Sequence, residues 1–174
     1  FTTEPFAIIK KPGYGRNRWL TMWQELIGRY SQRVKNEIEK GAIKKFALAI
    51  GENLPIYTDE DFAKKTPHGR IIAPPTFPRT LEYGEIKGLH LPPAGLIHGE
   101  QVYHYERPLY AGDVVYGQCQ LLSVEKKQTR SGQMLFVKLK QYGFDEQNKE
   151  IFTSEKTLLL TEKLLMDARW KELG

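Results

Sequence analysis

The chain has 174 residues, the length of a single domain, and a domain of this size buries about 70% of the surface that its unfolded chain exposes. Hydrophobic residues make up 40% of the chain and charged residues 27%, and no apolar run approaches the roughly 20 residues of a membrane span. The net charge is +5, but the lysines are dispersed in short clusters and form no basic stripe interleaved with aromatics, which argues against nucleic-acid binding.

The cysteine content and the first residues of the chain bear on the cellular compartment of the protein. The single Cys119 allows no disulfide within the chain, and it alternates with Val115 and Gly117 along a predicted strand, which indicates a buried thiol rather than a reactive one. The first 18 residues lack the basic segment and apolar core of a secretory signal. We therefore expect a cytoplasmic protein.

The amino-terminal part predicts an extension that leads into one packed helix. Residues 1–18 contain two prolines and two glycines and show no hydrophobic period. Whether they adopt an ordered structure should therefore depend on their packing against the rest of the protein. Apolar residues at helical spacing then predict a helix on the core, and these are Trp19, Met22, Trp23, Leu26 and Ile27. Gly28 ends this helix, and Tyr30 to Val34 is a candidate first strand. The extension, with the start of the helix, spans 1–25.

The clearest period in the chain runs from Gly41 to Ile50. Apolar residues recur there at i, i+3, i+4 and i+7 while lysines fall on the other side, which predicts a short amphipathic helix. Its expected buried face consists of Ala42, Ile43, Phe46, Ala47 and Ile50. Gly51 suits a left-handed cap and Pro55 prevents continuation, so residues 52–57 should form a tight polar turn.

The next segment is punctuated by turn residues. Asp59 is placed to cap a brief helix that runs through Lys64, and residues 66–69 form a loop. Residues 71–73 then lead into a pair of prolines. Residues 84–93 have glycine or proline at both ends and no strong period, so we expect an irregular loop.

The second half of the chain predicts strands. Four ranges separated by turn signals are 101–107, 114–124, 133–144 and 150–160. Leu135, Val137 and Leu139 alternate with positions that should face solvent, so the face of the sheet that carries the three apolar residues should be buried. Helices followed by consecutive strands predict an α+β fold with a mainly antiparallel sheet. The tail 162–174 has helical spacing.

Four blocks of sequence resemble the MaoC-like dehydratases. Residues 51–57 read GENLPIY, with Asp59 and Ala63 downstream, and resemble the hydratase signature G-D-x-N-P-[LIV]-H of that family. The segments 69–77, 95–101 and 107–113 resemble the N-terminal type of MaoC-like domain, also described as FAS1-like dehydratase. The resemblance covers roughly residues 26–161.

This resemblance implies a single hot-dog fold, in which an antiparallel sheet wraps round a central helix. That helix should begin near Pro75 or Thr76. The resemblance also implies action on acyl thioesters of coenzyme A or acyl carrier protein, and we expect no cofactor. It also implies a partner, because domains of this type pair with a second hot-dog chain as homodimers or heterodimers. The dispersed lysines then have two interpretations, as solvated surface or as attraction for an anionic carrier.

The family's catalytic positions hold different residues here. Glu52 occupies the position of the signature Asp, which keeps a carboxylate but displaces it by a methylene. Tyr57 occupies the position of the His, and a phenol with a pKa of about 10 is a poor base near neutrality. Leu54 replaces the signature Asn. Pro74 and Pro75 stand where active members have His-Gly, and proline offers no N–H to polarise a thioester carbonyl.

Three functions follow from these substitutions. A positioned acid or base contributes about 10²- to 10⁴-fold, so we expect a non-catalytic or weakly catalytic acyl-thioester-binding subunit of an (R)-3-hydroxyacyl dehydratase or enoyl hydratase. The alternative is a self-sufficient enzyme that uses Glu52 with Tyr57 or His68. A weaker alternative is a hot-dog thioesterase. Expected substrate-binding residues are Asn53, Ile72, Ala73, Pro75, Thr76 and Phe77. The four histidines show no metal-ligand spacing, so no metal site is expected.

Overall fold

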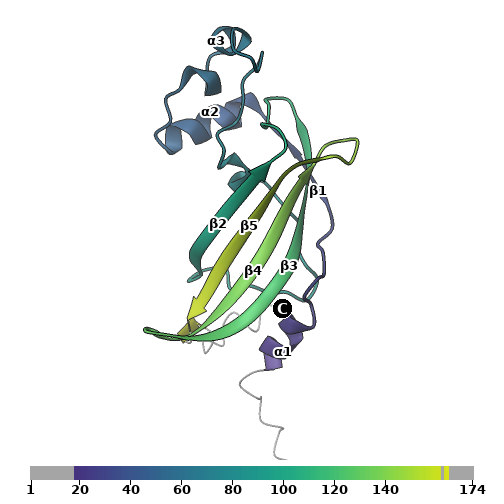
Figure 1. The fold of residues 1–174 in the computed structure, drawn as a ribbon, viewed down its shortest axis with the longest axis vertical. Coiled ribbons are helices and arrows are strands. Elements are labelled where there is room, and N and C mark those ends of the chain that lie inside the picture. The colour runs from purple at the N-terminus through teal and green to yellow at the C-terminus, as the bar shows by residue number, and fades with distance from the viewer. Residues whose placement is uncertain (1–17, 162, 165–174) are drawn as a thin grey trace, which may run out of the picture.

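The computed structural model describes residues 18–161, 163 and 164, which form one antiparallel sheet with short helices at its ends (Figure 1). The sheet has five strands in the order β1-β3-β4-β5-β2. The strands are β1 (Val34–Glu37), β2 (Ile97–Tyr105), β3 (Val114–Thr129), β4 (Gly132–Phe144) and β5 (Glu150–Thr161). The helices are α1 (Arg18–Gln24), α2 (Lys40–Ala49) and α3 (Glu60–Lys64), with two 3₁₀ turns, η1 (Pro55–Tyr57) and η2 (Phe77–Thr80).

One face of the sheet carries the core. Leu135, Val137 and Leu139 of β4 are 0 to 4% exposed, so the predicted alternation is confirmed. Cys119 is buried on the same face of β3, and burial raises the pKa of its thiol to about 11, which keeps the thiol protonated and unreactive. We call this face the inner face and the opposite one the outer face.

The helix predicted around Gly41 is present as α2. Ile43 and Ala47 are completely buried, and Gly51 adopts the left-handed conformation, with φ 77°, that ends the helix. The amide of Glu52 then donates to the carbonyl oxygen of Ala47 at 2.8 Å. The expected burial of Ile50 is wrong: it is 46% exposed, because the end of α2 projects beyond the strands together with α3 (Figure 1).

The short helix after the turn is also confirmed. The Asp59 carboxylate accepts from the amides of Asp61 and Phe62 at 2.9 and 3.0 Å, as expected for an N-terminal cap of α3. Ala63 of this helix is buried. The cap therefore stabilises the point at which the loop that begins at Glu52 ends and α3 begins.

The helix expected near Pro75 is reduced to the single 3₁₀ turn η2. The chain after it runs without regular structure until β2. Asn36 of β1 holds this segment in place, because its amide donates to the Glu82 carbonyl at 2.9 Å and its side-chain oxygen accepts from the Glu82 amide at 2.8 Å. Gly117 of β3 lies directly beneath, and a Cβ there would come within 2.2 Å of the Glu82 oxygen. An irregular segment thus packs on the inner face where a central helix was expected.

The amino-terminal expectations hold in part. The first helix ends at Gln24, with Trp23 only 3% exposed, and Gly28 follows with φ 87°. Residues 28–31 already exchange backbone hydrogen bonds with β3, but the regular strand begins at Val34 rather than Tyr30. The extension 1–17 and most of the predicted helical tail, 165–174, lie outside the described residues. Within the described part, no helix is long and apolar enough to cross a membrane.

Candidate functional site

The loop 52–57 presents one exposed carboxylate beside one buried phenol. Glu52 and Asn53 are exposed, whereas Tyr57 at the end of η1 is only 8% exposed and belongs to the core. The separation follows from the turn, since Pro55 starts η1 and turns the chain back toward the helices. The expected acid and base positions are therefore present, but only one of them faces solvent.

Burial and the nearby Glu52 carboxylate both raise the pKa of Tyr57. The phenol is therefore neutral throughout the physiological range. A neutral phenol donates a hydrogen bond or a proton but accepts a proton poorly. Tyr57 can thus act as an acid or a donor, and it is a worse base here than a free tyrosine.

The second expected site segment, residues 71–77, is fixed by backbone hydrogen bonds. The Ala73 amide donates to Leu109 at 2.8 Å, and the Phe77 amide donates to Pro74 at 2.9 Å. Pro75 has no N–H and is exposed, and its carbonyl accepts from the hydroxyl of Tyr105 at 2.6 Å. The resemblance implies a backbone donor at this position, and Pro75 has no N–H to supply it.

The next residue retains a free backbone donor. Thr76 is exposed, and within the described part of the chain its amide makes no hydrogen bond. It is the N-cap residue of η2, where the first N–H groups of a helical turn lack internal partners. The Thr76 amide is thus the nearest substitute for the donor that Pro75 lacks.

The apolar residues expected to contact an acyl chain pack mainly on each other. Phe77 is 3% exposed, and its ring meets the ring of Phe46 edge-to-face with centroids 5.5 Å apart, which joins η2 to α2. Ala73 is buried and Ile72 is half-buried. Of the expected substrate contacts, Asn53, Pro75 and Thr76 are the exposed ones.

His68 is not brought to Glu52 and Tyr57. It lies in an exposed loop, where its ring is 6.3 Å from the ring of Tyr110. The guanidinium of Arg70 stacks on Tyr110 at 4.0 Å. The described residues contain no group of three or more His, Cys, Asp or Glu that could hold a metal ion.

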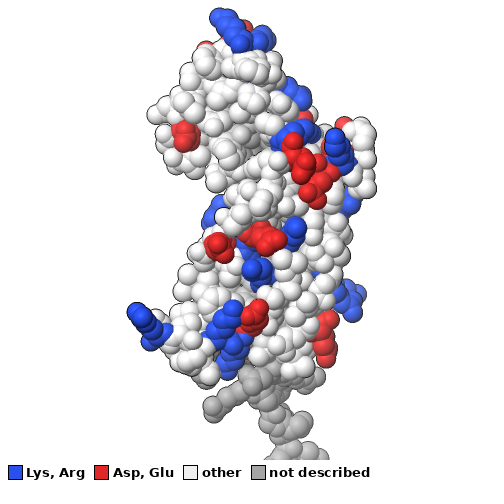
Figure 2. All heavy atoms as spheres, in the orientation of Figure 1, with Lys and Arg blue, Asp and Glu red and all other residues white. Residues whose placement is uncertain are grey.

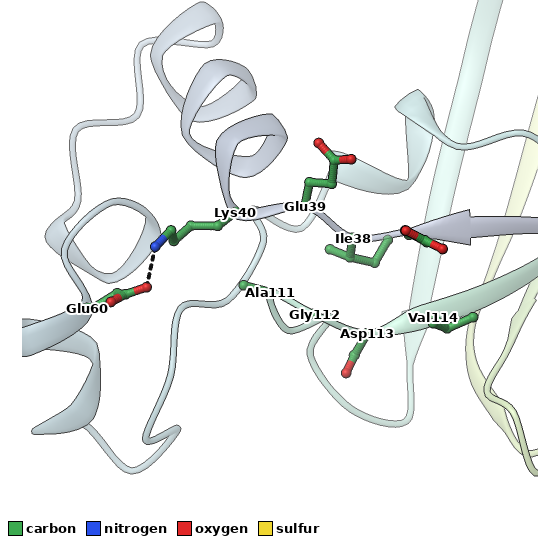
Figure 3. A pocket seen from close by; sticks show the side chains of 9 residues that line it. Ile38, Glu39, Lys40, Glu60, Ala111, Gly112, Asp113 and Val114 are labelled. Atoms are coloured by element: carbon green, nitrogen blue, oxygen red, sulfur yellow. Dashed lines mark hydrogen bonds and ion pairs between the residues drawn. The ribbon is translucent and has the colours of Figure 1, made fainter.

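A cavity of about 670 Å³ lies away from these residues, between the end of β1, the start of α2 and the turn before β3 (Figure 3). Lys40 reaches across it to form an ion pair with Glu60 at 2.5 Å. Its other charged lining residues are Glu37, Glu39 and Asp113. A cavity with four carboxylates suits neither an acyl chain nor an anionic carrier, so it is not the expected ligand site.

The polar residues of the inner face were not predicted from the sequence. Ser154 of β5 is completely buried there and accepts from the amide of Gln101 of β2 at 2.9 Å. Lys156 follows two residues later on the same face, opposite Gln101. The signal was the period-two spacing of Ser154, Lys156 and Leu158, which places all three on one face. It was obscured because apolar residues occupy consecutive positions of β5.

Exposed charges of both signs are interspersed over the face seen in Figure 2, and the surface is indented between the end that carries α2 and α3 and the strands. Exposed ion pairs such as Lys35–Glu37 at 2.7 Å account for part of the charge. This distribution favours the solvated-surface interpretation of the dispersed lysines over a single attractive field.

Comparison with protein families matches residues 25–154 to the FAS1-like dehydratase domain region. A UPF0336 protein of Streptomyces coelicolor is 37% identical over 97 residues, which cover 52% of this chain and 65% of that protein. The match thus spans less than two thirds of that relative.

Solved structures share the fold at low identity. The HadBC (3R-hydroxyacyl-ACP dehydratase) complex from Mycobacterium tuberculosis has a TM-score of 0.65 at 20% identity, covering 78% of this chain and 97% of that one. A structure described as a MaoC-like dehydratase has a TM-score of 0.66 at 17% identity, covering 86% of this chain and 46% of that one. The described architecture is therefore that of the hot-dog dehydratases, an α+β fold with an antiparallel sheet.

Proposed function

Because this chain belongs to the FAS1-like dehydratase family, with the MaoC-like hot-dog fold, we propose that it binds an acyl thioester of coenzyme A or acyl carrier protein as a weakly catalytic or non-catalytic subunit. Its partner would be a second hot-dog chain, either a further copy of this chain or a chain that carries the intact Asp and His. The partnership would form an (R)-3-hydroxyacyl dehydratase, which also runs in reverse as an enoyl hydratase.

The observation that carries this proposal is the pair of Tyr57 and Pro75. Dehydration breaks the C2–H and C3–O bonds of a 3-hydroxyacyl thioester, so a base must take the C2 proton while an acid protonates the leaving hydroxyl. Tyr57 has a raised pKa and is buried, which disfavours it as the base. Pro75 cannot donate to the thioester oxygen. Loss of one such donor alone costs about 10²- to 10³-fold in rate.

The edge of the sheet at β2 supports the proposed partnership. Within the described residues, β2 pairs on one side only, with β5. Ile97 and Val102 of β2 are 45 and 41% exposed, and an unpaired edge with apolar side chains is a surface that proteins usually cover. A second hot-dog chain added at β2 would continue the sheet. The HadBC structure is itself a complex, which supports a paired assembly without indicating the surface used.

A self-sufficient enzyme is the second candidate. It is favoured by the exposed Glu52 carboxylate, by the neutral Tyr57 as an acid, and by the unpaired Thr76 amide as a donor for the thioester oxygen. In this alternative Glu52 takes the C2 proton and Tyr57 protonates the hydroxyl. The two candidates share the ligand and differ in turnover.

Binding and turnover must therefore be measured separately. Calorimetric titration with saturated acyl-coenzyme A of four, six and eight carbons should show affinity that rises with length, by about fourfold per buried methylene. Equal affinities for all three lengths, or no binding, would contradict the proposed acyl site. Free coenzyme A serves as the control for contacts that do not involve the acyl chain.

A further inference from the structure

Two arginines and a histidine gather round the ring of Tyr110. The guanidinium of Arg70 lies 4.0 Å from the centre of this ring and that of Arg107 lies 5.7 Å away, both within the range of a cation–π contact. The ring of His68 is 6.3 Å from the same ring. Side chains from two separate stretches of sequence therefore converge on one tyrosine.

A single carboxylate holds both arginines. Arg107 donates through Nη1 to the Asp113 carboxylate at 2.5 Å. The Tyr110 amide donates to the same oxygen at 3.0 Å. Arg70 approaches the other oxygen of Asp113 at 3.6 Å, the distance of an ion pair rather than of a hydrogen bond. The Asp113 side chain is 9% exposed whereas that of Arg70 is 54% exposed, so a buried acid anchors a guanidinium that reaches the surface.

Most of the hydrogen-bonding capacity of this cluster is unused. Within the described residues, Arg70 makes no hydrogen bond, and neither the Tyr110 hydroxyl nor the His68 ring makes one. Arg107 uses only Nη1 of its guanidinium, which also donates to a backbone carbonyl at 2.9 Å. Two guanidiniums share one carboxylate, so the cluster stays positive after this pairing. Stacking on Tyr110 holds the Arg70 fork in place for a ligand.

The acids of the neighbouring cavity oppose this charge only weakly. Asp113 also lines that cavity, which is shown in Figure 3. Glu60 and Glu37 are each paired with a lysine there, at 2.5 and 2.7 Å. Glu39 has no ion pair within the described part of the chain, and its side chain points away from that of Asp113 (Figure 3). The outward side of the two arginines is therefore the side open to an anion.

The cluster is tied to the segment that contains Thr76. An antiparallel bridge joins Ile72 to Tyr110, and backbone hydrogen bonds on either side of it, at 2.8 and 3.0 Å, keep the two stretches in register. From Arg70 the chain runs on to the free amide of Thr76, a span of at most about 20 Å when extended. The pantetheine arm of coenzyme A separates its sulfur from its phosphates by a similar length. A thioester held at Thr76 can thus reach the cluster with the far end of its arm.

We propose that Arg70 and Arg107, held on Tyr110, bind the phosphate at the end of the pantetheine arm of an acyl thioester. This inference rests on the proposed function, because it concerns the carrier end of the same ligand. A phosphate accepts paired hydrogen bonds from guanidinium forks, and its strong hydration suits a site at the surface. Coenzyme A and the prosthetic group of acyl carrier protein share this phosphate. His68 and the Tyr110 hydroxyl are further donors at the border of the site.

The test uses hexanoyl thioesters in calorimetric titrations of the full chain. Hexanoyl-pantetheine has no phosphate, and hexanoyl-phosphopantetheine has the one phosphate that both carriers share. We expect the phosphorylated thioester to bind about tenfold more tightly or better, the effect of a hydrogen bond to a charged group. Arg70→Met should remove most of this preference and leave the affinity for hexanoyl-pantetheine within about twofold of the original. Arg70→Lys keeps the charge without the fork and should restore only part of the preference.

The same titrations identify the carrier. Hexanoyl-coenzyme A and hexanoyl-acyl carrier protein both present the shared phosphate, so Arg70→Met should weaken the binding of whichever of them binds more tightly. Either carrier agrees with the inference. A tight carrier that binds Arg70→Met as well as the original chain would overturn it.

Arg130→Met is the matched control. Arg130 is an exposed arginine in the turn that follows β3, at the opposite end of that strand from Asp113, so its loss should leave the preference intact. Equal affinities for hexanoyl-pantetheine and hexanoyl-phosphopantetheine would overturn the inference and leave the proposed function standing. Equal losses for both thioesters in Arg70→Met, or a loss of preference in Arg130→Met as large as in Arg70→Met, would overturn it too. Absence of binding by every thioester would overturn the proposed function as well.

Discussion

Tyr105 donates its hydroxyl to the carbonyl oxygen of Pro75 at 2.6 Å, across 30 residues of sequence. This bond ties the chain just before η2 to β2, one of the two edge strands of the sheet. Burial raises the pKa of Tyr105, so the phenol remains a donor at all physiological pH values. The segment that would polarise a thioester is thus positioned by the same strand that would meet a partner.

Tyr105→Phe should lower the free energy of unfolding by about 1 kcal/mol, because it removes one hydrogen bond and leaves the ring in place. Urea denaturation followed by circular dichroism measures this change. Tyr103→Phe is the matched control, since Tyr103 lies on the same strand and makes no hydrogen bond within the described residues. Equal losses in the two variants would mean that the bond to Pro75 contributes nothing specific.

Gly117→Ala should destabilise the protein by about 1 to 3 kcal/mol, because the new methyl group would overlap the Glu82 carbonyl and push the irregular segment off the inner face. Gly41→Ala is the control: nothing lies within 4 Å of its Cβ position in α2, so alanine should stabilise by about 0.5 to 1 kcal/mol. Thermal unfolding of both variants checks the pair. An unchanged Gly117→Ala would show that the segment does not rest on β3.

Lys156→Met should raise the unfolding temperature by about 2 to 4 °C at neutral pH, which corresponds to about 1 kcal/mol. The pKa of Lys156 is lowered in the folded state, so the charged form is disfavoured by folding, and that penalty is complete below the folded pKa. As pH rises through the folded pKa toward 10.5, wild-type Lys156 loses its proton and the advantage of methionine should shrink. An advantage independent of pH would assign the gain to packing instead.

Val102→Lys should block association through β2, because it adds a charge to the exposed apolar edge. Light scattering of the wild-type chain at micromolar concentration should give the mass of a dimer, and the variant should give that of a monomer. Thr157→Lys places a charge on the neighbouring strand β5 instead and should leave the mass unchanged. A monomeric wild-type chain would contradict the expectation that the exposed edge at β2 mediates association.

The local elements of the fold could be predicted from the sequence. The periods around Gly41 and Leu135 identify α2 and β4 because each element buries one face, and the cap of α3 follows from Asp59 alone. Such signals depend on residues a few positions apart. The hot-dog architecture followed from the motif resemblance together with the run of four strands.

The segment after Pro75 could not be predicted in the same way. Its conformation depends on Asn36 and Ser31, which bond to Glu82 and Tyr83 from 46 and 52 positions away. The resemblance to the MaoC-like family predicted a helix in the segment after Pro75, whereas these long-range hydrogen bonds hold the segment in an irregular conformation. Lys156 was missed for a related reason, since its face is assigned by the register with β4 and β2 rather than by its neighbours in sequence.

The turnover of the purified chain on crotonyl-coenzyme A tests the central claim most directly. The substitutions at Glu52, Tyr57 and Pro75 predict hydration slower than about 1 s⁻¹, the lower end of ordinary enzyme rates. They also predict that Glu52→Gln leaves this residual rate almost unchanged. Turnover well above 1 s⁻¹ that disappears in Glu52→Gln would contradict the account and establish the chain as an enzyme in its own right.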